Sequence, residues 1–481
     1  MNRLEVNIIP TPKKAVYGEG NCTFNFNVKA DEVFKKHIPL YIKTASKIFE
    51  TDVAEGNGGI VLAFDTEIKN GAYKIKADDG CLEISASDDE GILYGIASAF
   101  QYIDTKKGEV KKVEIEDYTD KPYRGLMVDL ARQWHAPYTI FKYIDLCFFY
   151  KVKHLHLHFC DNQRYTLPSK KYPKLNKPGN FYTEEEIKAF CEYAKERGVI
   201  LIPEVEMPGH TKVLNVNYPE IFSCELADDN FSMKSEVGEV ITSDNIICAG
   251  SEKSYNAICD LVDEALELFA DFPYIHFGGD EAAIKVWNNC KHCRDYMKKH
   301  GLENEKALYS EYTGRMAKYI LSKGKTPIVW EGFPEDYMDM IPKETLVILW
   351  ENHYNTPEAL LGAGFKLINC SWKPLYVVNH YVQNWHPFKL LEWNTYNWQH
   401  WWPESRACAN PVQLEPTEQV LGAQLCAWEL TYEQEITRVM ENLAVVSERT
   451  WNETTECQAG HFHGKFIDIL YRAGRLLRYD G

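Results

Sequence analysis

The chain has 481 residues, of which 45% are hydrophobic and 26% are charged, and this ordinary composition excludes a mainly disordered protein. A formal net charge of −17 argues against nucleic acid or an anionic membrane as the main partner, because both require a basic surface. The sequence as given shows neither an apolar run that could span a bilayer nor a secretory signal, so we expect a cytoplasmic protein without membrane contact.

The first part of the chain predicts a small α+β domain over residues 1–118, without visible chemistry. The turn-rich stretch Glu116–Pro122 marks its end, so a second domain is expected over residues 119–481. In chain order we expect strands at Leu4–Ile9, Thr23–Val28, Gly59–Phe64, Tyr73–Ala77 and Cys81–Ala86, and helices at Ala30–Phe49 and Asp89–Tyr102.

From Tyr123 onward, short apolar strands alternate with amphipathic helices, which predicts an α/β fold, a (β/α)8 TIM barrel. The seventh crossover, Ser371–Gln419, is aromatic rather than plainly helical, and six of the 12 tryptophans lie between Trp372 and Trp402. The expected strands are Gly125–Asp129, His154–Phe159, Val199–Val205, Tyr274–Gly278, Pro327–Glu331, Leu346–Glu351, Phe365–Cys370 and Val420–Trp428. The expected helices include Thr139–Tyr150, Thr183–Arg197, Ser254–Phe269, Lys306–Ser322 and Glu433–Ser447.

The 14 cysteines are scattered, and many stand in apolar runs, so we interpret them as reduced, buried side chains. One close pair exists, Cys290-Lys-His-Cys293. A single C-x-x-C is a weak signal for zinc or redox chemistry, because a second pair is missing. We therefore expect no cofactor at this pair.

Polar residues follow the ends of most predicted barrel strands. All carboxyl-terminal strand ends of a barrel face one surface, where active sites lie. The sequence therefore predicts one site built from many strands. The residues concerned are Asp129 and Arg132; His156, His158 and Asp161; Glu204, Glu206 and His210; Asp280 and Glu281; Trp330 and Glu331; Trp350 and Glu351; Trp428 and Glu429.

The sharpest motif is His276-Phe-Gly-Gly-Asp280-Glu281. Adjacent side chains on a regular strand point to opposite faces, so both carboxylates can face a ligand only if the strand breaks at the glycine pair. Two neighbouring carboxylates push their pKa values apart, which is the division of labour found in glycosidases. Indole rings at three strand ends, Trp330, Trp350 and Trp428, fit the same chemistry because they pack against sugar faces.

Two alternatives stay open at this point. His154-Leu-His156-Leu-His158, with His210 and Asp280, offers the ligands of a metal-dependent amidohydrolase-like barrel. The H-x-H would then stand on the second strand rather than the first, and the later strands end in Trp and Glu, which disfavours that reading. The second alternative is a catalytically silent glycan-binding barrel, which we would expect to have lost one of the paired carboxylates.

The complete set of motifs resembles glycoside hydrolase family 20, the β-N-acetylhexosaminidases. VDLAR, LHLHFCDNQ with the following KYPKL, PEVEMPGHT and HFGGDE resemble family motifs in the same order, and HFGGDE is the catalytic signature. IIPTP and the α+β composition of the N-terminal part are similar to the accessory domain of the family. Where the family usually has Trp-x-Glu on the last strand, this chain has Trp428 followed directly by Glu429.

The resemblance implies an exo-acting, retaining glycosidase that releases terminal β-linked N-acetylhexosamine from glycans or glycoconjugates, with the substrate's acetamido group as nucleophile. It implies no cofactor and no metal. The implied catalytic residues are Glu281 as general acid and base, Asp280 as orienting group, and His210 backed by Asp161. The implied substrate-binding residues are Arg132, His158, Trp330, Trp350, Tyr376, Trp428 and Glu429. The Trp372–Trp402 segment is expected to contribute to specificity or to a homodimer contact.

Overall fold

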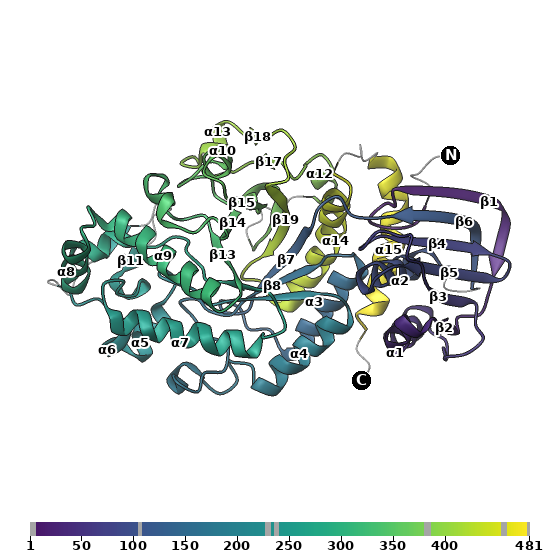
Figure 1. Ribbon diagram of the computed structural model, residues 1–481, viewed down its shortest axis with the longest axis horizontal. Helices are drawn as coiled ribbons and strands as arrows, with labels where there is room; N and C mark the ends of the chain where they lie inside the picture. The colour runs from purple at the N-terminus through teal and green to yellow at the C-terminus, as the bar shows by residue number, and fades with distance from the viewer. Residues whose placement is uncertain are drawn as a thin grey trace.

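The structure is a computed structural model that describes residues 6–103, 108–226, 232–234, 240–379, 386–453 and 459–478. Figure 1 shows two parts, an N-terminal α+β domain at one end and a barrel that occupies the rest of the molecule. Helices α6 (Pro219–Phe222) and α8 (Lys291–His300) lie in the part of the barrel far from the N-terminal domain. Among the described residues, no helix is both long and apolar enough to cross a membrane.

The N-terminal domain is a six-stranded sheet in the order β1-β6-β4-β5-β3-β2, with helices beside it. Helix α2 starts at Asp88, whose side chain accepts a hydrogen bond from the Gly91 amide, as N-cap residues do. The strands are β1 (Lys14–Thr23), β2 (Val28–Ala30), β3 (Ile60–Phe64), β4 (Tyr73–Asp78), β5 (Cys81–Ala86) and β6 (Glu109–Asp117), and the helices are α1 (Ile38–Phe49) and α2 (Asp89–Tyr102).

Two predicted strands of this domain differ from the structure, and two observed strands were not predicted. Residues 6–9 of the predicted first strand form no strand, and Leu4 and Glu5 lie outside the described residues. The predicted strand Thr23–Val28 is mostly the connection between β1 and β2, and the sequence analysis missed β1 and β6. Most residues of β1 are exposed, so this edge strand carries little hydrophobic pattern.

The barrel predicted from the sequence is confirmed. Its eight parallel strands close because β19 pairs with both β15 and β7, and the short strand β16 (Tyr376–Val377) adds to β19. Most strand residues are buried, as expected for a parallel sheet that is covered on both faces. The barrel strands are β7 (Tyr123–Asp129), β8 (His154–His158), β9 (Ile200–Glu204), β12 (Tyr274–His276), β13 (Thr326–Trp330), β14 (Leu346–Leu349), β15 (Lys366–Asn369) and β19 (Val420–Ala427).

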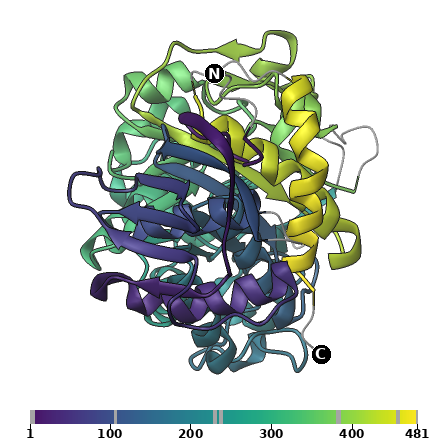
Figure 2. The same cartoon turned by 90° about the vertical axis from the view of Figure 1, so that its right-hand side faces the viewer.

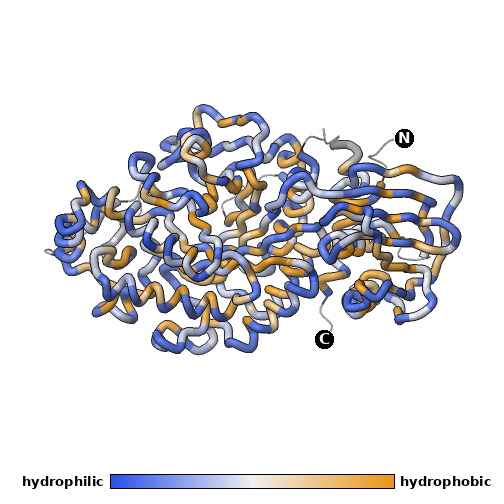
Figure 3. Tube along the Cα trace, viewed as in Figure 1, coloured by the Kyte–Doolittle hydropathy of each residue, from blue (hydrophilic) through white to orange (hydrophobic). Residues whose placement is uncertain are grey.

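Amphipathic helices cover the outside of the barrel. Figure 3 shows that hydrophobic residues are frequent along the strands, whereas hydrophobic and hydrophilic residues alternate along the outer helices. Helix α4 begins at a capping box, in which Thr183 and Glu186 bond each other's backbone amides. The crossover helices that the sequence predicted are α3 (Pro137–Phe149), α4 (Glu184–Glu196), α7 (Glu252–Leu268), α9 (Glu305–Ser322) and α14 (Tyr432–Trp451).

The last helix, α15 (Ala459–Leu476), was assigned to the barrel domain at residues 119–481, but it lies beside α1 of the N-terminal domain (Figure 2). Lys465 Nζ donates to the Ile8 carbonyl at 2.7 Å, and Arg475 binds Glu50 at 2.9 Å. The C-terminal helix thus ties the N-terminal domain to the barrel. The domain limits at 118 and 119 stay a prediction.

Candidate active site

The described site residues from eight strand ends lie at the carboxyl-terminal mouth of the barrel, as the topology required. The loop after β12 provides the paired carboxylates. Gly278 and Gly279 adopt positive φ angles of 71° and 105°, and a Cβ on Gly278 would lie 1.8 Å from a Glu206 oxygen. Only glycine fits there, so the strand breaks as the sequence predicted. Glu281 follows with φ 44°, and both carboxylates come within 4 Å of one histidine nitrogen, which lies on another loop.

That histidine is His210, in the loop after β9. Its Nε2 lies 3.2 Å from Glu281 Oε2 and 3.8 Å from Asp280 Oδ2, while its Nδ1 faces Asp161 Oδ1 at 3.4 Å. Burial disfavours the imidazolium, but Asp161 and Asp280 outweigh it and raise the pKa of His210 well above its usual value. His210 is therefore cationic in the unliganded site.

The two paired carboxylates have opposite pKa shifts. Burial acts to raise the pKa of Glu281, but the hydrogen bond and charge of His210 together with Arg132 bring it below its usual range. Burial, reinforced by the charge of Glu281, raises the pKa of Asp280. The sequence had predicted that these two pKa values would separate. In the unliganded site they separate in the opposite order to the one that an acid role for Glu281 needs, because His210 lies closer to Glu281 than to Asp280.

Asp161 lies at the centre of the polar network. Its side chain, almost fully buried, forms an ion pair with Arg132 Nε at 2.8 Å, bonds His158 Nε2 at 3.1 Å and faces His210. The Arg132 charge holds the pKa of Asp161 well below its usual value despite burial. A carboxylate fixed in this way orients the arginine and both histidines.

Arg132 extends from this network toward the last strand. Its Nη1 lies 3.4 Å from Glu429 Oε1, and its guanidinium lies 4.8 Å from the centre of the Trp428 ring. Asp129 holds the loop, because its carboxylate accepts from the amides of Ala131 and Arg132 at 3.0 and 2.9 Å. The structure therefore brings Glu429 beside Arg132, although this chain lacks the usual spacing of the family motif.

The predicted aromatic residues meet in one cluster inside the mouth. Trp330 and Trp428 have ring centres 6.1 Å apart, and Tyr376 lies 6.3 Å from Trp350 and 6.5 Å from Trp428. Trp372 stacks on Tyr376 at 4.6 Å from the long seventh crossover. All four predicted aromatic site residues are thus brought together. Their binding roles stay predictions.

Beneath the site lies a buried network to which the sequence analysis assigned no role. Glu204, at the end of β9, accepts a hydrogen bond from Trp330 Nε1 at 2.6 Å and also bonds His158. Its carboxylate lies 2.8 Å from His276 Nδ1 and 3.0 Å from His156 Nε2. Burial acts to raise the pKa of Glu204, but the charge of His158, followed by those of His276 and His156, brings it well below the usual value. A polar residue at a strand end predicts a place near the site, and Glu204 fits that pattern. Its partners could not be predicted, because they come from three other strands.

A second buried carboxylate organises the loop after β14. Glu331 is fully buried and accepts from the amides of Glu351, Asn352, Tyr354 and Asn355 at 2.8–3.2 Å. Trp350 Nε1 donates to the backbone carbonyl of the same glutamate at 3.0 Å. Glu331 therefore fixes the position of Trp350 and takes no part in the chemistry of the site.

The amidohydrolase ligand set is not assembled. His154 stands at the start of β8, and its ring stacks on Tyr123 at 4.2 Å, away from the strand ends. His156 faces Glu204 in the barrel interior. His210 and Asp280 lie together with Glu281, whereas His156 and His158 each lie with Glu204 instead.

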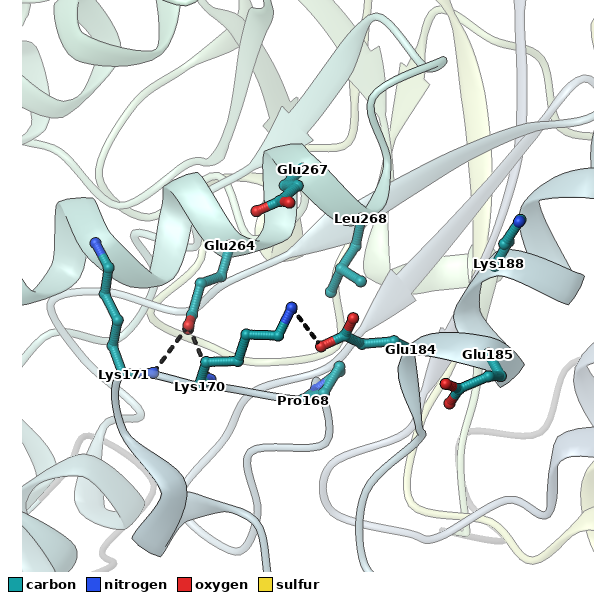
Figure 4. Close-up of a pocket in the computed structure, with 9 residues that line it drawn as sticks. All are labelled: Pro168, Lys170, Lys171, Glu184, Glu185, Lys188, Glu264, Glu267 and Leu268. Carbon is teal, nitrogen blue, oxygen red and sulfur yellow. Dashed lines mark hydrogen bonds and ion pairs between the residues drawn. The ribbon is translucent and has the colours of Figure 1, made fainter.

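A pocket of about 560 Å³ lies outside the barrel mouth, between the loop before α4 and helix α7 (Figure 4). Two of its carboxylates have partners within the lining: Glu184 pairs with Lys170 at 2.8 Å, and Glu264 accepts from the backbone amides of Lys170 and Lys171. This pocket belongs to the helical layer and contains none of the predicted site residues.

Comparison with known proteins agrees with this geometry. The family model described as glycosyl hydrolase family 20, catalytic domain, matches residues 122–454, and the model described as domain 2 of the same family matches residues 5–118. The beta-hexosaminidase subunit beta of Entamoeba histolytica is 27% identical over 96% of this chain and 87% of its own length. The beta-hexosaminidase of Akkermansia muciniphila is 29% identical, but the alignment covers 55% of this chain and 56% of that protein.

Solved structures share the fold. A beta-N-acetylhexosaminidase from Bacteroides fragilis aligns with a TM-score of 0.77 at 24% identity, over 96% of this chain and 94% of that chain. A GH20 exo beta-N-acetylglucosaminidase from Vibrio harveyi, in complex with N-acetylglucosamine, aligns with a TM-score of 0.83 at 21% identity, over 98% and 78%. These findings support the glycosidase over the amidohydrolase-like and silent-barrel alternatives. The chain belongs to glycosyl hydrolase family 20 and is a glycoside hydrolase of the β-N-acetylhexosaminidase type.

Proposed function

We propose that the protein releases terminal β-linked N-acetylhexosamine with retention of configuration, using the 2-acetamido oxygen of the substrate as the nucleophile. One observation carries this proposal. Asp280 Oδ1 is buried beside the aromatic cluster and has no hydrogen-bond partner among the described residues. An unpartnered buried acceptor costs free energy, so it needs a donor from the ligand, and the amide N–H of an acetamido group supplies one.

In the first step, the acetamido oxygen attacks the anomeric carbon while the bond from that carbon to the leaving oxygen breaks. Glu281, as a carboxylic acid, gives its proton to the leaving oxygen, and the acetamido group becomes an oxazolinium ion. Asp280 accepts the N–H bond and stabilises the positive charge that develops on this ring. In the second step, water attacks the anomeric carbon, gives its proton to Glu281 and restores the acetamido group.

The proton for this step is held by the pair of His210 and Glu281. The unliganded site favours cationic His210 beside ionised Glu281. The Glu281 side chain is 47% exposed there, and a bound sugar would cover it. Desolvation raises the pKa of a carboxylate, so substrate binding moves the shared proton toward Glu281, across the 3.2 Å contact.

The surrounding side chains would select the sugar. Trp330, Trp350 and Trp428 would enclose the acetyl methyl group, and the Tyr376 hydroxyl would donate to the acetamido oxygen. The buried Trp428 Nε1 has no hydrogen-bond partner among the described residues, so it can donate to the ligand. The adjoining ion pair of Arg132 and Glu429, 3.4 Å apart, would bind the sugar hydroxyls at the rim of the site.

The nucleophile can be tested directly with β-N-acetylglucosaminides that carry one, two or three fluorine atoms on the acetyl methyl group. Fluorine withdraws electrons from the acetamido oxygen, so kcat should fall steeply with each addition. A β-configured initial product, observed by proton NMR, should accompany turnover. A rate that is independent of fluorination would refute the proposal, and the Glu281→Gln variant provides the background rate.

The predicted cytoplasmic location and the predicted homodimer stay predictions. Cell fractionation would test the first, and sedimentation analysis of the purified chain would test the second. Neither affects the chemistry proposed for the site.

A further inference from the structure

Four cysteines from three segments of the chain converge outside the active site. Cys224 follows α6, Cys248 precedes α7, and Cys290 and Cys293 stand at the start of α8. Their four sulfur atoms all lie within 4.8 Å of one another. Cys248 Sγ is 3.5 Å from Cys290 Sγ and 3.7 Å from Cys293 Sγ. The sequence analysis had treated the Cys290–Cys293 pair alone and expected no cofactor there.

We propose that these four cysteines bind one structural Zn²⁺ ion. A tetrahedral site with Zn–S bonds of about 2.3 Å separates its sulfur atoms by about 3.8 Å, which matches the observed spacing. A disulfide would require about 2.05 Å between two sulfurs, well below the measured separations. Four ligands from the protein complete the coordination shell, as is typical of structural rather than catalytic zinc.

The surroundings suit four thiolates. Cys248, Cys290 and Cys293 are fully buried, where unpaired thiolates would be costly but metal-bound ones are neutralised. Cys290 is the N-cap residue of α8, so its sulfur lies near the positive end of a ten-residue helix.

The charge pattern of α8 supports the same ligand. Its first turn contains Lys291, His292 and Arg294 and no acidic residue. Basic side chains are unfavourable at a helix N-terminus, because they repel its partial positive charge. Zn²⁺ with four thiolates carries a net charge of −2, and this charge would compensate them.

The ion would connect two active-site loops. The loop after β9 carries His210 and continues through Cys224 and Cys248, whereas the loop after β12 carries Glu281 and continues to Cys290. Backbone contacts already join them here: Lys291 N donates to the Glu225 carbonyl at 3.0 Å, and Trp287 Nε1 donates to the Ile247 carbonyl at 2.9 Å. The site would therefore stabilise the alignment of His210 with Glu281 without touching substrate.

The test is the metal content of the protein as purified. Plasma mass spectrometry should find one zinc per chain, and a mercurial reagent that binds thiolates should release it to a colorimetric chelator. Growth in cobalt should give thiolate-to-cobalt charge-transfer absorption and the visible bands of a tetrahedral site. The proposal would be overturned if these four cysteines were free thiols without metal, if the intact mass showed two disulfides among them, or if the protein held iron in place of zinc.

Variants locate the site. Cys290→Ser/Cys293→Ser should lose the zinc and unfold at a lower temperature, whereas Cys191→Ser should keep one zinc per chain. Cys191 is a suitable control because it is a buried cysteine of α4, outside the cluster, whose thiol donates to the Leu268 carbonyl. Zinc retained by the double variant would contradict the assignment. If that variant does not fold, the metal content of the unaltered protein still decides.

Discussion

His210 Nε2 lies 3.2 Å from Glu281 Oε2, and its Nδ1 lies 3.4 Å from Asp161 Oδ1, so one imidazole joins the proposed acid to a buried carboxylate. The raised pKa of His210 and the lowered pKa of Glu281 describe a pair that holds one proton. The pair keeps this proton until the pH rises through the raised pKa of His210.

The first prediction follows from this pair. In the unaltered enzyme, kcat/KM should stay high through neutral pH and fall only above the usual histidine pKa of about 6.5. In His210→Asn, the proton must sit on Glu281 alone, so the alkaline limb should move down toward the ordinary range of a carboxyl group. Above the limb, each unit of this shift costs about tenfold in kcat/KM. The measurement is a pH–rate profile, with His300→Asn on the surface of α8 as the control; unchanged limbs would contradict the shared proton.

The second prediction concerns the acid itself. Glu281→Gln should lower kcat/KM by about 10²- to 10⁴-fold on substrates with a basic leaving group, since general acid catalysis is worth that much. An activated aryl leaving group needs less protonation, so its loss should be much smaller. Both classes of substrate are compared on one preparation. Equal losses on the two would remove Glu281 from the acid role.

The third prediction tests the buried anchor of the loop after β14. Glu331→Gln replaces a carboxylate that accepts from four amides, so the free energy of unfolding should fall by about 2 kcal/mol. The carboxylate also accepts from the amide of Glu351, the residue after Trp350, so Trp350 should lose its fixed position and KM should rise. Glu335→Gln, in an exposed ion pair with Arg406, is the matched control in chemical denaturation. Equal stability of the two variants would show that the buried carboxylate is not an anchor.

The barrel could be predicted because its strands are short apolar runs followed by polar residues. The motif HFGGDE also predicted the break after strand β12, because two glycines precede two carboxylates there. The interior network around Glu204 could not be predicted, because its partners His156, His276 and Trp330 approach only after the barrel closes. Strand β1 was missed for another reason: it is an edge strand on which most residues are exposed. Strand β6 lies inside the sheet, and its buried and exposed residues largely alternate, so that pattern was present in the sequence and was overlooked.

The cysteine cluster shows the same limit of sequence patterns. Cys290 and Cys293 form a weak motif, and nothing in the sequence joins them to Cys224 and Cys248. The pairing depends on how two long loops fold over each other after β9 and β12. A spacing rule therefore finds a binding site only when its ligands are close along the chain.

The fourth prediction separates structural from catalytic metal. Brief exposure to a chelator should leave turnover unchanged, because four cysteine ligands leave no open position on the ion and none faces the substrate. Prolonged exposure with a thiolate reagent should remove zinc and lower the thermal unfolding temperature. Rapid and complete inactivation by the chelator alone, reversed by zinc, would indicate a catalytic metal instead.

The fifth prediction concerns the acetamido nucleophile. A group held in a near-attack pose gains a large effective molarity, so the matching β-glucoside, which has a hydroxyl at carbon 2, should be essentially inert. A thiazoline analogue of the oxazolinium ion should bind far more tightly than substrate, as expected for a mimic of a high-energy species.

Asp280→Asn isolates the orienting group. Asn keeps the size of the side chain but loses the charge that would face the developing cation, so the first chemical step should slow while the unfolding temperature stays near that of the unaltered protein. Single-turnover kinetics with an activated aryl substrate measures that step directly. Because Asp280 Oδ1 has no hydrogen-bond partner among the described residues, the substitution removes no hydrogen bond to that oxygen within them, and its effect should come from the ligand. Cleavage of β-glucosides as fast as N-acetylglucosaminides, or a trapped covalent glycosyl–carboxylate, would show that a carboxylate of the protein is the nucleophile.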